Sequence, residues 1–340
     1  MNESIMKIKE LRIVLILLAF TLPLVSCNND DDDELEGNWS ELSDFDGVPR
    51  SDATGFAIGT NGYLGTGYDG EDRRVDFWEY NTEKNYWTQK ADFPGAARNG
   101  AVGFAIGEKG YIGTGYDGEN KLKDFYEYDP SANTWTQIED FAGSARYGAV
   151  SFAIGDNGYV GTGYDGNYLK DFYKYSPDSK SWTQIISIGG SKRRDATAFV
   201  INGIGYVVSG VDNGSYENDF YCYDPSTGEW TALNKISNVT DYDFDNDYTT
   251  IARINAVGMS FNGKGYLVTG STSTVLSNVW EYDPVEDLWE ERTEFEGTAR
   301  VEAVGFGIGN LGYVATGRSS SYYLDDIWCF DPTAEYDEYN

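Results

Sequence analysis

The sequence predicts an all-β chain that folds into a six-bladed β-propeller with four antiparallel strands in each blade. Three observations lead to this prediction. The chain has 40 Gly but only 8 Pro, which is typical of many tight turns between short strands. A unit of about 48 residues recurs six times. The tryptophan that ends a unit also precedes the first one, so the N-terminal strand is expected to close the last blade.

Residues 1–26 are predicted to form a signal peptide. Basic residues within positions 7–12 precede an apolar run at 13–25, which is too short to cross a bilayer comfortably as a helix. The sequence from Leu24 to Cys27 resembles the lipobox of bacterial lipoproteins, and this resemblance implies that Cys27 is lipidated. A simple secretory signal with an incidental cysteine is the alternative.

An acidic tether is predicted at residues 27–37, where aspartate and glutamate dominate as they do in solvated, flexible chain. This stretch resembles the acidic tags that send some Gram-negative lipoproteins to the outer face of the cell. We therefore expect an outer-membrane lipoprotein exposed at the cell surface, with the periplasmic face as the alternative. The propeller itself is expected at 38–335, followed by an acidic tail at 336–340.

Each repeat begins at an arginine and reaches the tyrosine of a Gly-Tyr pair 13 residues later. The offset is the same in all six repeats, which indicates a rigid structural unit. The arginines are Arg50, Arg98, Arg146, Arg193, Arg253 and Arg300. The tyrosines are Tyr63, Tyr111, Tyr159, Tyr206, Tyr266 and Tyr313.

Four short strands, a to d, are expected in each unit. In the first unit strand a covers 53–58, strand b covers 62–67, strand c covers 76–80 and strand d begins at Trp87. A tight hairpin containing glycine joins a to b, and Tyr-Asp-Pro sequences such as 128–130 provide turns after strand c. Four-stranded units of this length are typical of a β-propeller.

The size of the side chains changes from strand a to strand d. Strand a carries small residues two positions apart on one face, such as Ala53 and Gly55, whereas strand d carries a tryptophan. Blades converge at a propeller axis and splay apart at the rim, so this gradient favours a closed ring over a solenoid. The sixth unit has no tryptophan after its last strand, so the segment 39–42 is predicted to complete it. The tryptophans are Trp39, Trp87, Trp135, Trp182, Trp230 and Trp289.

These features resemble kelch repeats across residues 39–332. The arginine before strand a, the end of strand b, the Tyr-Asp-Pro turn and the tryptophan all match, although Thr-Gly or Ser-Gly replaces the family's Gly-Gly. The resemblance implies a kelch-like propeller of the galactose-oxidase superfamily. The kelch-type sialic-acid epimerases, also called mutarotases, are the nearest enzyme analogy. Galactose oxidase activity is excluded, because its copper site uses histidines and this chain has none.

The composition excludes several classes of function. With no histidine, the chain cannot form a His-based catalytic triad or an imidazole metal site. A net charge of −31 argues against binding the phosphates of nucleic acid. No cofactor is expected.

The six arginines have two interpretations. The d–a and b–c loops share one face of the predicted disc, which we call the arginine face. There the arginines, near the axis, are either a site for carboxylate or sulfate groups, or clamps that pair with nearby acids. Their presence in every blade favours clamps, because binding sites usually break symmetry. The expected partners are Asp76, Asp124, Asp171, Asp219 and Asp326.

Three b–c loops on the arginine face share a Tyr-Asp-Gly sequence. A flat amphipathic ring beside a hydrogen-bonding acid suits the binding of sugars or peptides. Turn formation, with the tyrosine packed over the blade edge, explains the same sequence equally well. The candidate residues are Tyr68, Asp69, Tyr116, Asp117, Tyr164 and Asp165.

One insertion interrupts the repeats, since the distance from tryptophan to arginine is 23 residues between Trp230 and Arg253 but 11 elsewhere. If this loop is extended, its alternating aspartates share one side and form a weak Ca²⁺ candidate, although the full EF-hand pattern is absent. A solvated lid beside the arginine face, which presents aromatic residues to a partner, is the favoured alternative. The aspartates are Asp241, Asp243, Asp245 and Asp247.

The favoured function is a surface-anchored, non-catalytic propeller that recognises a glycan or a cell-envelope protein through the arginine face. No nucleic acid is expected as a partner, and the membrane is contacted only through the lipid anchor. The alternatives are a carbohydrate-active enzyme like the sialic-acid epimerases and a scaffold for a surface complex. No catalytic residue is assigned. Cys222 and Cys329 occupy equivalent strands in blades that are not neighbours, so no disulfide is expected.

Overall fold

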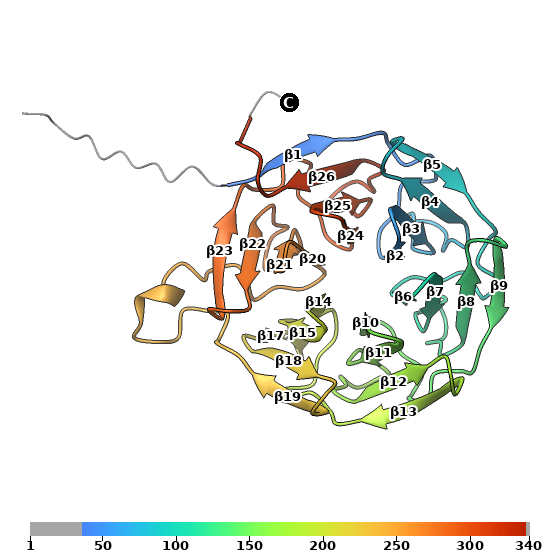
Figure 1. Ribbon diagram of the computed structural model, residues 1–340, viewed down its shortest axis with the longest axis horizontal. Coiled ribbons are helices and arrows are strands. Elements are labelled where there is room, and N and C mark those ends of the chain that lie inside the picture. Colours follow the sequence, from blue (N-terminus) through green and yellow to red (C-terminus); the bar gives the residue numbers. More distant parts are fainter. Residues whose placement is uncertain (1–35, 338–340) are drawn as a thin grey trace, which may run out of the picture. The chain divides into compact units, whose positions relative to one another are not determined.

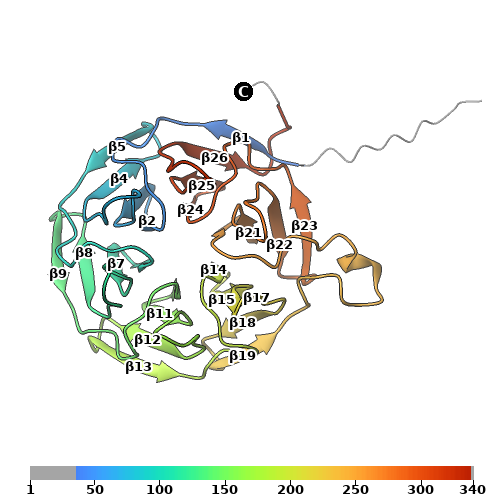
Figure 2. The ribbon, with the colours of Figure 1, turned by 180° about the vertical axis from the view of Figure 1, so that it is seen from behind.

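Six four-stranded antiparallel sheets surround a central axis in the computed structural model, which describes residues 36–337 (Figure 1). Strand a of each blade lies nearest the axis and strand d lies at the rim, as the view from behind also shows (Figure 2). The predicted six-bladed propeller is therefore confirmed. The predicted signal peptide and Cys27 lie outside the described residues. No helix of the described part is long and apolar enough to span a membrane.

The first three blades are nearly identical in their strand boundaries. Blade 1 contains β2 (Thr54–Ile58), β3 (Asn61–Gly65), β4 (Phe77–Asn81) and β5 (Tyr86–Gln89). Blade 2 contains β6 (Val102–Ile106), β7 (Lys109–Gly113), β8 (Phe125–Asp129) and β9 (Thr134–Gln137). Blade 3 contains β10 (Val150–Ile154), β11 (Asn157–Gly161), β12 (Phe172–Ser176) and β13 (Ser181–Ile185).

The other three blades carry the departures from strict repetition. Blade 4 contains β14 (Thr197–Ile201), β15 (Ile204–Val208), β18 (Phe220–Asp224) and β19 (Glu229–Ala232), with a small hairpin of β16 (Val211–Asp212) and β17 (Ser215–Tyr216). Blade 5 contains β20 (Val257–Phe261), β21 (Lys264–Val268), β22 (Val279–Asp283) and β23 (Leu288–Arg292). Blade 6 contains β24 (Val304–Ile308), β25 (Leu311–Ala315), β26 (Ile327–Asp331) and β1 (Asn38–Glu41).

The chain ends meet in blade 6. Strand β1 pairs antiparallel with β26, and Trp39 stands opposite Phe330 in this register. Trp39 is fully buried, and its ring packs 4.8 Å from those of Phe295 and Phe330. The N-terminal segment is therefore the outer strand of the last blade, as predicted.

Aromatic side chains fill the spaces between neighbouring blades. Phe77 of blade 1 contacts Tyr128 and Trp135 of blade 2, with ring centroids 4.8 and 4.9 Å apart. A glycine in strand b makes room for the previous blade. A Cβ atom added at Gly110 would lie 2.1 Å from the ring of Phe56. Repeated aromatic packing of this kind forms the core in place of a single aliphatic centre.

A closed ring of six backbone hydrogen bonds surrounds the axis on the arginine face. Its members stand two positions after each arginine, and all have positive φ, from 54° to 61°. Each backbone N–H donates to the carbonyl of the corresponding residue in the preceding blade, over 2.9–3.3 Å. We call this feature the axial ring. Its members are Asp52, Gly100, Gly148, Asp195, Asn255 and Glu302.

Candidate functional site

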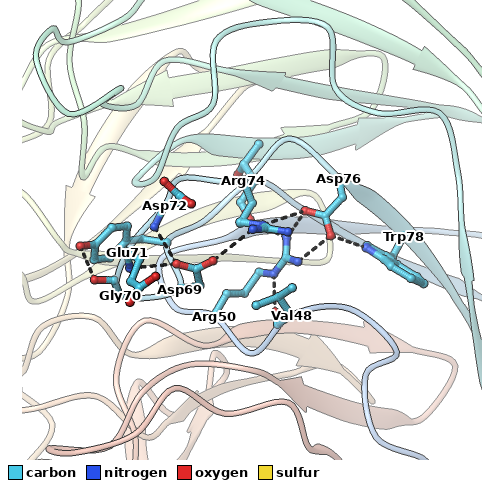
Figure 3. A network of polar contacts seen from close by, with 11 residues as sticks. Val48, Arg50, Asp69, Gly70, Glu71, Asp72, Arg74, Asp76 and Trp78 are labelled. Carbon is cyan, nitrogen blue, oxygen red and sulfur yellow. Dashed lines mark hydrogen bonds and ion pairs between the residues drawn. The ribbon is translucent and has the colours of Figure 1, made fainter.

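The arginine that begins each repeat is buried. Figure 3 shows Arg50 with Val48 and Asp76 among its partners. Its Nη1 and Nη2 donate to the two carboxylate oxygens of Asp76 over 2.7 and 2.6 Å. Nη1 also donates to Thr66 O, and Nε donates to Val48 O. Five N–H donors in a rigid fork suit this arrangement, which a lysine could not reproduce.

The same pairing recurs in five blades, with the acids predicted from the sequence. Exposure of all six arginines is 0–1%. Burial alone would raise the pKa of Asp76, but the bonds from Arg50 outweigh it and hold that pKa below its ordinary value. The pairs are Arg50–Asp76, Arg98–Asp124, Arg146–Asp171, Arg193–Asp219 and Arg300–Asp326.

The arginine backbones connect one blade to the next. Arg98 of blade 2 accepts a 2.8 Å hydrogen bond at its carbonyl from Gly67 N of blade 1, while its side chain pairs within blade 2. Each arginine is therefore a clamp between blades, and its burial leaves no side-chain surface for the alternative, a site for carboxylate or sulfate groups. Equivalent bonds join Gly115 to Arg146, Gly163 to Arg193, Gly210 to Arg253, Gly270 to Arg300 and Gly317 to Arg50.

A cavity of about 520 Å³ opens on the arginine face above the axial ring. We call it the tyrosine-walled pocket, because five tyrosines line it together with three basic side chains. Asp52 and Glu302 of the axial ring also line it, with Ser51 and Asn99 beside them. The tyrosines are Tyr68, Tyr116, Tyr147, Tyr164 and Tyr323, and the basic residues are Arg73, Lys121 and Arg318.

The two halves of each Tyr-Asp-Gly motif have different roles. The three tyrosines line the pocket, as the binding interpretation required. The aspartates do not line it, because they accept hydrogen bonds from their own loops. Asp69 Oδ1, for example, accepts from the backbone N–H groups of Glu71 and Asp72. Asp117 and Asp165 form the same kind of turn, so for the aspartates the turn interpretation holds.

Arg73 is the most distinctive side chain of the pocket. Its guanidinium lies between two aromatic rings, 5.2 Å from the centroid of Tyr68 and 5.0 Å from that of Tyr116. Its Nε donates to Asn99 Oδ1 over 2.7 Å. Among the described residues, neither Nη group makes a hydrogen bond and no carboxylate pairs with Arg73. A guanidinium held flat with its Nη edge uncommitted is preorganised to bind an anion.

The other two basic side chains of the pocket differ in whether a carboxylate pairs with them. Lys121 lies 5.7 Å from the ring of Tyr164 and forms no ion pair within the described chain. Arg318 pairs with Glu302 over 2.8 Å. The sequence analysis did not identify Arg73, Lys121 or Arg318 as candidates.

Acidic side chains gather at the axial ring beneath the pocket. Burial, followed by the charge of Glu302, raises the pKa of Asp52 well above its ordinary value, although the hydrogen bond from Asn99 opposes the shift. Burial also raises the pKa of Asp195 to about 6 against the opposing charge of Arg194. The two carboxyl groups therefore keep their protons to a higher pH than exposed aspartates do.

The pocket breaks the sixfold symmetry of the fold. The position of Tyr68, Tyr116 and Tyr164 is occupied by Val211 in blade 4 and by Ser271 in blade 5. The position directly after each clamp arginine is equally variable, with Ser51, Asn99 and Tyr147 in the first three blades. Variation at these two positions is the signal of the pocket in the sequence, and it lies outside the pattern that the repeats share.

The insertion lies away from the pocket. It forms a short 3₁₀ helix, η1 (Asp243–Asp245), at the outer rim beyond β23 (Figures 1 and 2). Tyr248 Oη accepts a 2.7 Å bond from Trp289 N, so the loop covers the edge of blade 5. The expectations of an extended loop and of a lid beside the arginine face are therefore wrong.

The four aspartates of the insertion do not form a calcium site. Asp245 is buried and accepts hydrogen bonds from the backbone N–H groups of Val239 and Thr240. Within residues 36–337, no three Asp, Glu or Cys side chains are grouped to hold a metal ion. Cys222 in β18 and Cys329 in β26 are free thiols.

Comparisons with known proteins agree with this architecture. The model of the kelch motif matches residues 192–236. The solved structure of YjhT is similar with a TM-score of 0.70 over 84% of this chain and 95% of that chain, at 16% sequence identity. No curated protein matches the chain significantly. Similarity at this identity concerns the fold alone, so the comparisons and the structure lead to one conclusion: the chain is a six-bladed β-propeller in which residues 192–236 match the kelch motif.

Proposed function

We propose that this chain is a recognition propeller whose tyrosine-walled pocket binds a glycan that carries an acidic group. The observation that supports this most strongly is Arg73, an uncommitted guanidinium held between two tyrosine rings in a protein of net charge −31. Carboxylates far outnumber basic residues in this chain. A basic side chain that lines a cavity and has no carboxylate partner therefore favours an anionic ligand.

The walls of the pocket support a sugar rather than an apolar ligand. Tyrosine offers a flat apolar face and a polar edge, and both suit the alternating C–H and O–H groups of a sugar ring. The floor adds hydrogen-bonding groups from Ser51 and Asn99. A volume of about 520 Å³ lies within the usual range for ligand pockets.

Anchoring at the cell surface completes the proposal. Lipidation at Cys27 and the acidic tether would hold the propeller at the outer membrane, where extracellular glycans are within reach. The support for this location comes from the sequence of residues 1–37 alone. A cell-envelope protein is the alternative partner, which the same pocket would bind through an acidic side chain.

A glycan array with matched acidic and neutral pairs tests this proposal. Each sialylated or uronate-containing glycan is printed beside the same glycan without its carboxylate. We expect retention of the protein by acidic members only, because only these engage Arg73. Equal retention of both members of each pair, or of neither, would contradict an acidic glycan as the ligand.

An acid–base enzyme acting on an acidic sugar is the second candidate. The specific observation in its favour is the pair Asp52 and Glu302 at the pocket floor, where the raised pKa of Asp52 favours its protonated form, as a general acid requires. Anomeric exchange of N-acetylneuraminate, followed by NMR, separates the two candidates. A recognition protein leaves the rate equal to that in buffer. An enzyme accelerates it and loses this effect in Asp52→Asn.

A further inference from the structure

A two-step hydrogen-bonded relay connects the tyrosine-walled pocket to the axial ring. Arg73 Nε donates to Asn99 Oδ1 over 2.7 Å, and Asn99 Nδ2 donates to Asp52 Oδ2 over 2.6 Å. Arginine can only donate and an ionised carboxylate can only accept, so the Asn99 amide has one orientation that satisfies both. Asp52 therefore fixes the orientation of the Asn99 amide, which in turn supports Arg73.

Asp52 lies between the tyrosine-walled pocket and a smaller cavity beneath it. It lines the tyrosine-walled pocket and a second cavity of about 130 Å³ along the axis. Its backbone is fixed in the axial ring with φ of 54°, between Glu302 and Gly100. The side chain is held in place by the ring below and by Asn99 above.

Several other charged groups face Asp52. Glu302 is its neighbour in the axial ring and pairs with Arg318, which lies above it. Asp195 stands on the opposite side of the ring, with Arg194 Nε 3.4 Å from its carboxylate. Of these groups, none is hydrogen-bonded to Asn99, so only Asp52 acts directly on the relay.

We propose that Asp52 is a proton-linked positioning residue for an anion subsite at Arg73, so that the pocket binds its acidic ligand more tightly as the pH falls. This inference rests on the proposed function. Ionised Asp52 orients Arg73 through Asn99, but its negative charge also opposes an incoming anion. Protonation removes that charge while the tyrosine rings keep the guanidinium in place.

The electrostatic surroundings support a proton-linked role. Burial and the charge of Glu302 raise the pKa of Asp52, and the charge of Asp195 acts in the same direction. The Asn99 bond and Arg318 act against them. A ligand anion at Arg73 adds one more negative charge, which raises this pKa further. By linkage, protonation of Asp52 strengthens anion binding to the same extent.

Isothermal titration with N-acetylneuraminate and with glucuronate at pH 8.0 and pH 5.5 tests the inference. Both probes stay ionised over this interval. We expect the wild-type protein to bind the better probe about fivefold or more tightly at pH 5.5. Asp52→Asn keeps the shape and the positive φ of the residue, as Asn255 does in blade 5. This variant should bind at both pH values about as well as the wild type does at pH 5.5.

Asp195→Asn is the matched control, because it makes the same change on the opposite side of the axial ring. It should retain most of the pH dependence, since Asp195 has no bond to Asn99. Asn99→Ala should weaken binding at both pH values, because Arg73 loses its support. An unchanged pH dependence in Asp52→Asn, or its loss in Asp195→Asn alone, would overturn the inference.

A measurement without ligand separates this inference from the proposed function. The ¹³C signals of the aspartate carboxyls are followed against pH, and Asp52 is assigned by its absence in Asp52→Asn. Its midpoint should lie above that of the exposed aspartates and rise further in Asn99→Ala, which removes a bond to the ionised form. If neither probe binds at any pH, the proposed function fails. If the titration midpoint of Asp52 equals that of the exposed aspartates, or does not change in Asn99→Ala, the proposed relay is contradicted.

Discussion

Two kinds of arginine coexist in this protein, and their surroundings explain their different roles. Arg50 and its equivalents are buried and mostly paired with a carboxylate through two hydrogen bonds. Arg73 is held only by aromatic rings and one amide. Removing one partner of a buried ion pair leaves an uncompensated charge in the interior, so the clamps are needed for stability.

Arg98→Ala is expected to lower the free energy of unfolding by about 3–5 kcal/mol, because it leaves Asp124 without its partner. Unfolding in urea measures the change. Lys109→Ala is the control, since the Lys109–Asp129 pair lies at the surface with side chains 36% and 30% exposed. That change should cost about 0–1 kcal/mol. Similar losses in both variants would contradict the clamp role.

The clamp partners could be predicted because 25 or 26 residues separate each arginine from its acid. Arg50 and Asp76 are 26 residues apart, and the distance is the same for Arg98 and Asp124. Spacing does not reveal burial, so the sequence left open whether the arginines were a site. Arg73 could not be identified at all, since its role depends on two tyrosines from different loops.

Among the six blades, blade 5 contains the clamp arginine whose positive charge is paired least well. Asn278 stands where the other blades have aspartate, so Arg253 bonds only to carbonyl groups and to Thr250. Burial lowers the pKa of Arg253, and Glu291 only partly opposes the shift. The charge on Arg253 is therefore stabilised less well than that of the other clamps.

Asn278→Asp is expected to destabilise the protein by about 1 kcal/mol or more, because Asn278 Nδ2 donates to Glu291 Oε1 over 2.7 Å and to Glu294 Oε1 over 3.4 Å. A carboxylate in its place loses these bonds and is repelled by both glutamates. The melting temperature measures this effect. Asn262→Asp, an exposed change in the same blade, should leave it unaltered. A higher melting temperature for Asn278→Asp would contradict this expectation and show that the new carboxylate pairs with Arg253, as aspartate pairs with the arginine of the other blades.

Strand β1 is predicted to contribute as much to the stability of the protein as the outer strand of any other blade. Trp39→Ala should destabilise the protein by about 3–5 kcal/mol, as expected for a fully buried tryptophan. Trp87→Ala, in the equivalent strand of blade 1, provides the comparison and should cost a similar amount. Unfolding in urea measures both. A negligible loss for Trp39→Ala alone would mean that the last blade does not need the N-terminal strand.

The strand boundaries were predictable to within one or two residues because the same sequence pattern recurs in all six repeats. The insertion was not, because it occurs once and its structure depends on the edge of blade 5. Its alternating aspartates suggested an extended loop, but Asp245 instead bonds to the backbone N–H groups of its own turn.

At the scale of the whole molecule, two groups of acids respond to pH in opposite directions. For Asp76 the pKa is lowered, so its contribution to stability is present above the ordinary value of 3.8 and is lost as the pH falls below it. For Asp195 the pKa is raised to about 6, so the folded state favours the protonated form. Its penalty is present above pH 6 and disappears as the pH falls towards 3.8.

Asp195→Asn is therefore expected to raise the free energy of unfolding by about 1–3 kcal/mol at pH 8, with the difference vanishing near pH 4. Urea unfolding at the two pH values measures this. Asp241→Asn, an exposed change in the insertion, should have no effect at either. An equal gain at both pH values would show that packing, and not charge, penalises Asp195.

The symmetric disc carries an asymmetric pocket over blades 1, 2, 3 and 6, and this asymmetry suggests recognition. The axial ring joins all six blades, so residues from separate repeats are held at fixed distances around the pocket. The proposed ligand class depends on one side chain within this frame, Arg73, and its neighbour in sequence provides a matched control. Arg74 pairs with Asp69 and with Asp76, the carboxylate partner of Arg50 (Figure 3).

The most direct test is isothermal titration of Arg73→Gln and Arg74→Gln with the acidic glycan that the array retains best. Arg73→Gln should lose about tenfold or more in affinity, because the ligand carboxylate loses a charged bidentate partner. Arg74→Gln changes the net charge equally and should lose less than about twofold. Equal affinities of the two variants would contradict the assignment of the tyrosine-walled pocket as the site of acidic-glycan recognition.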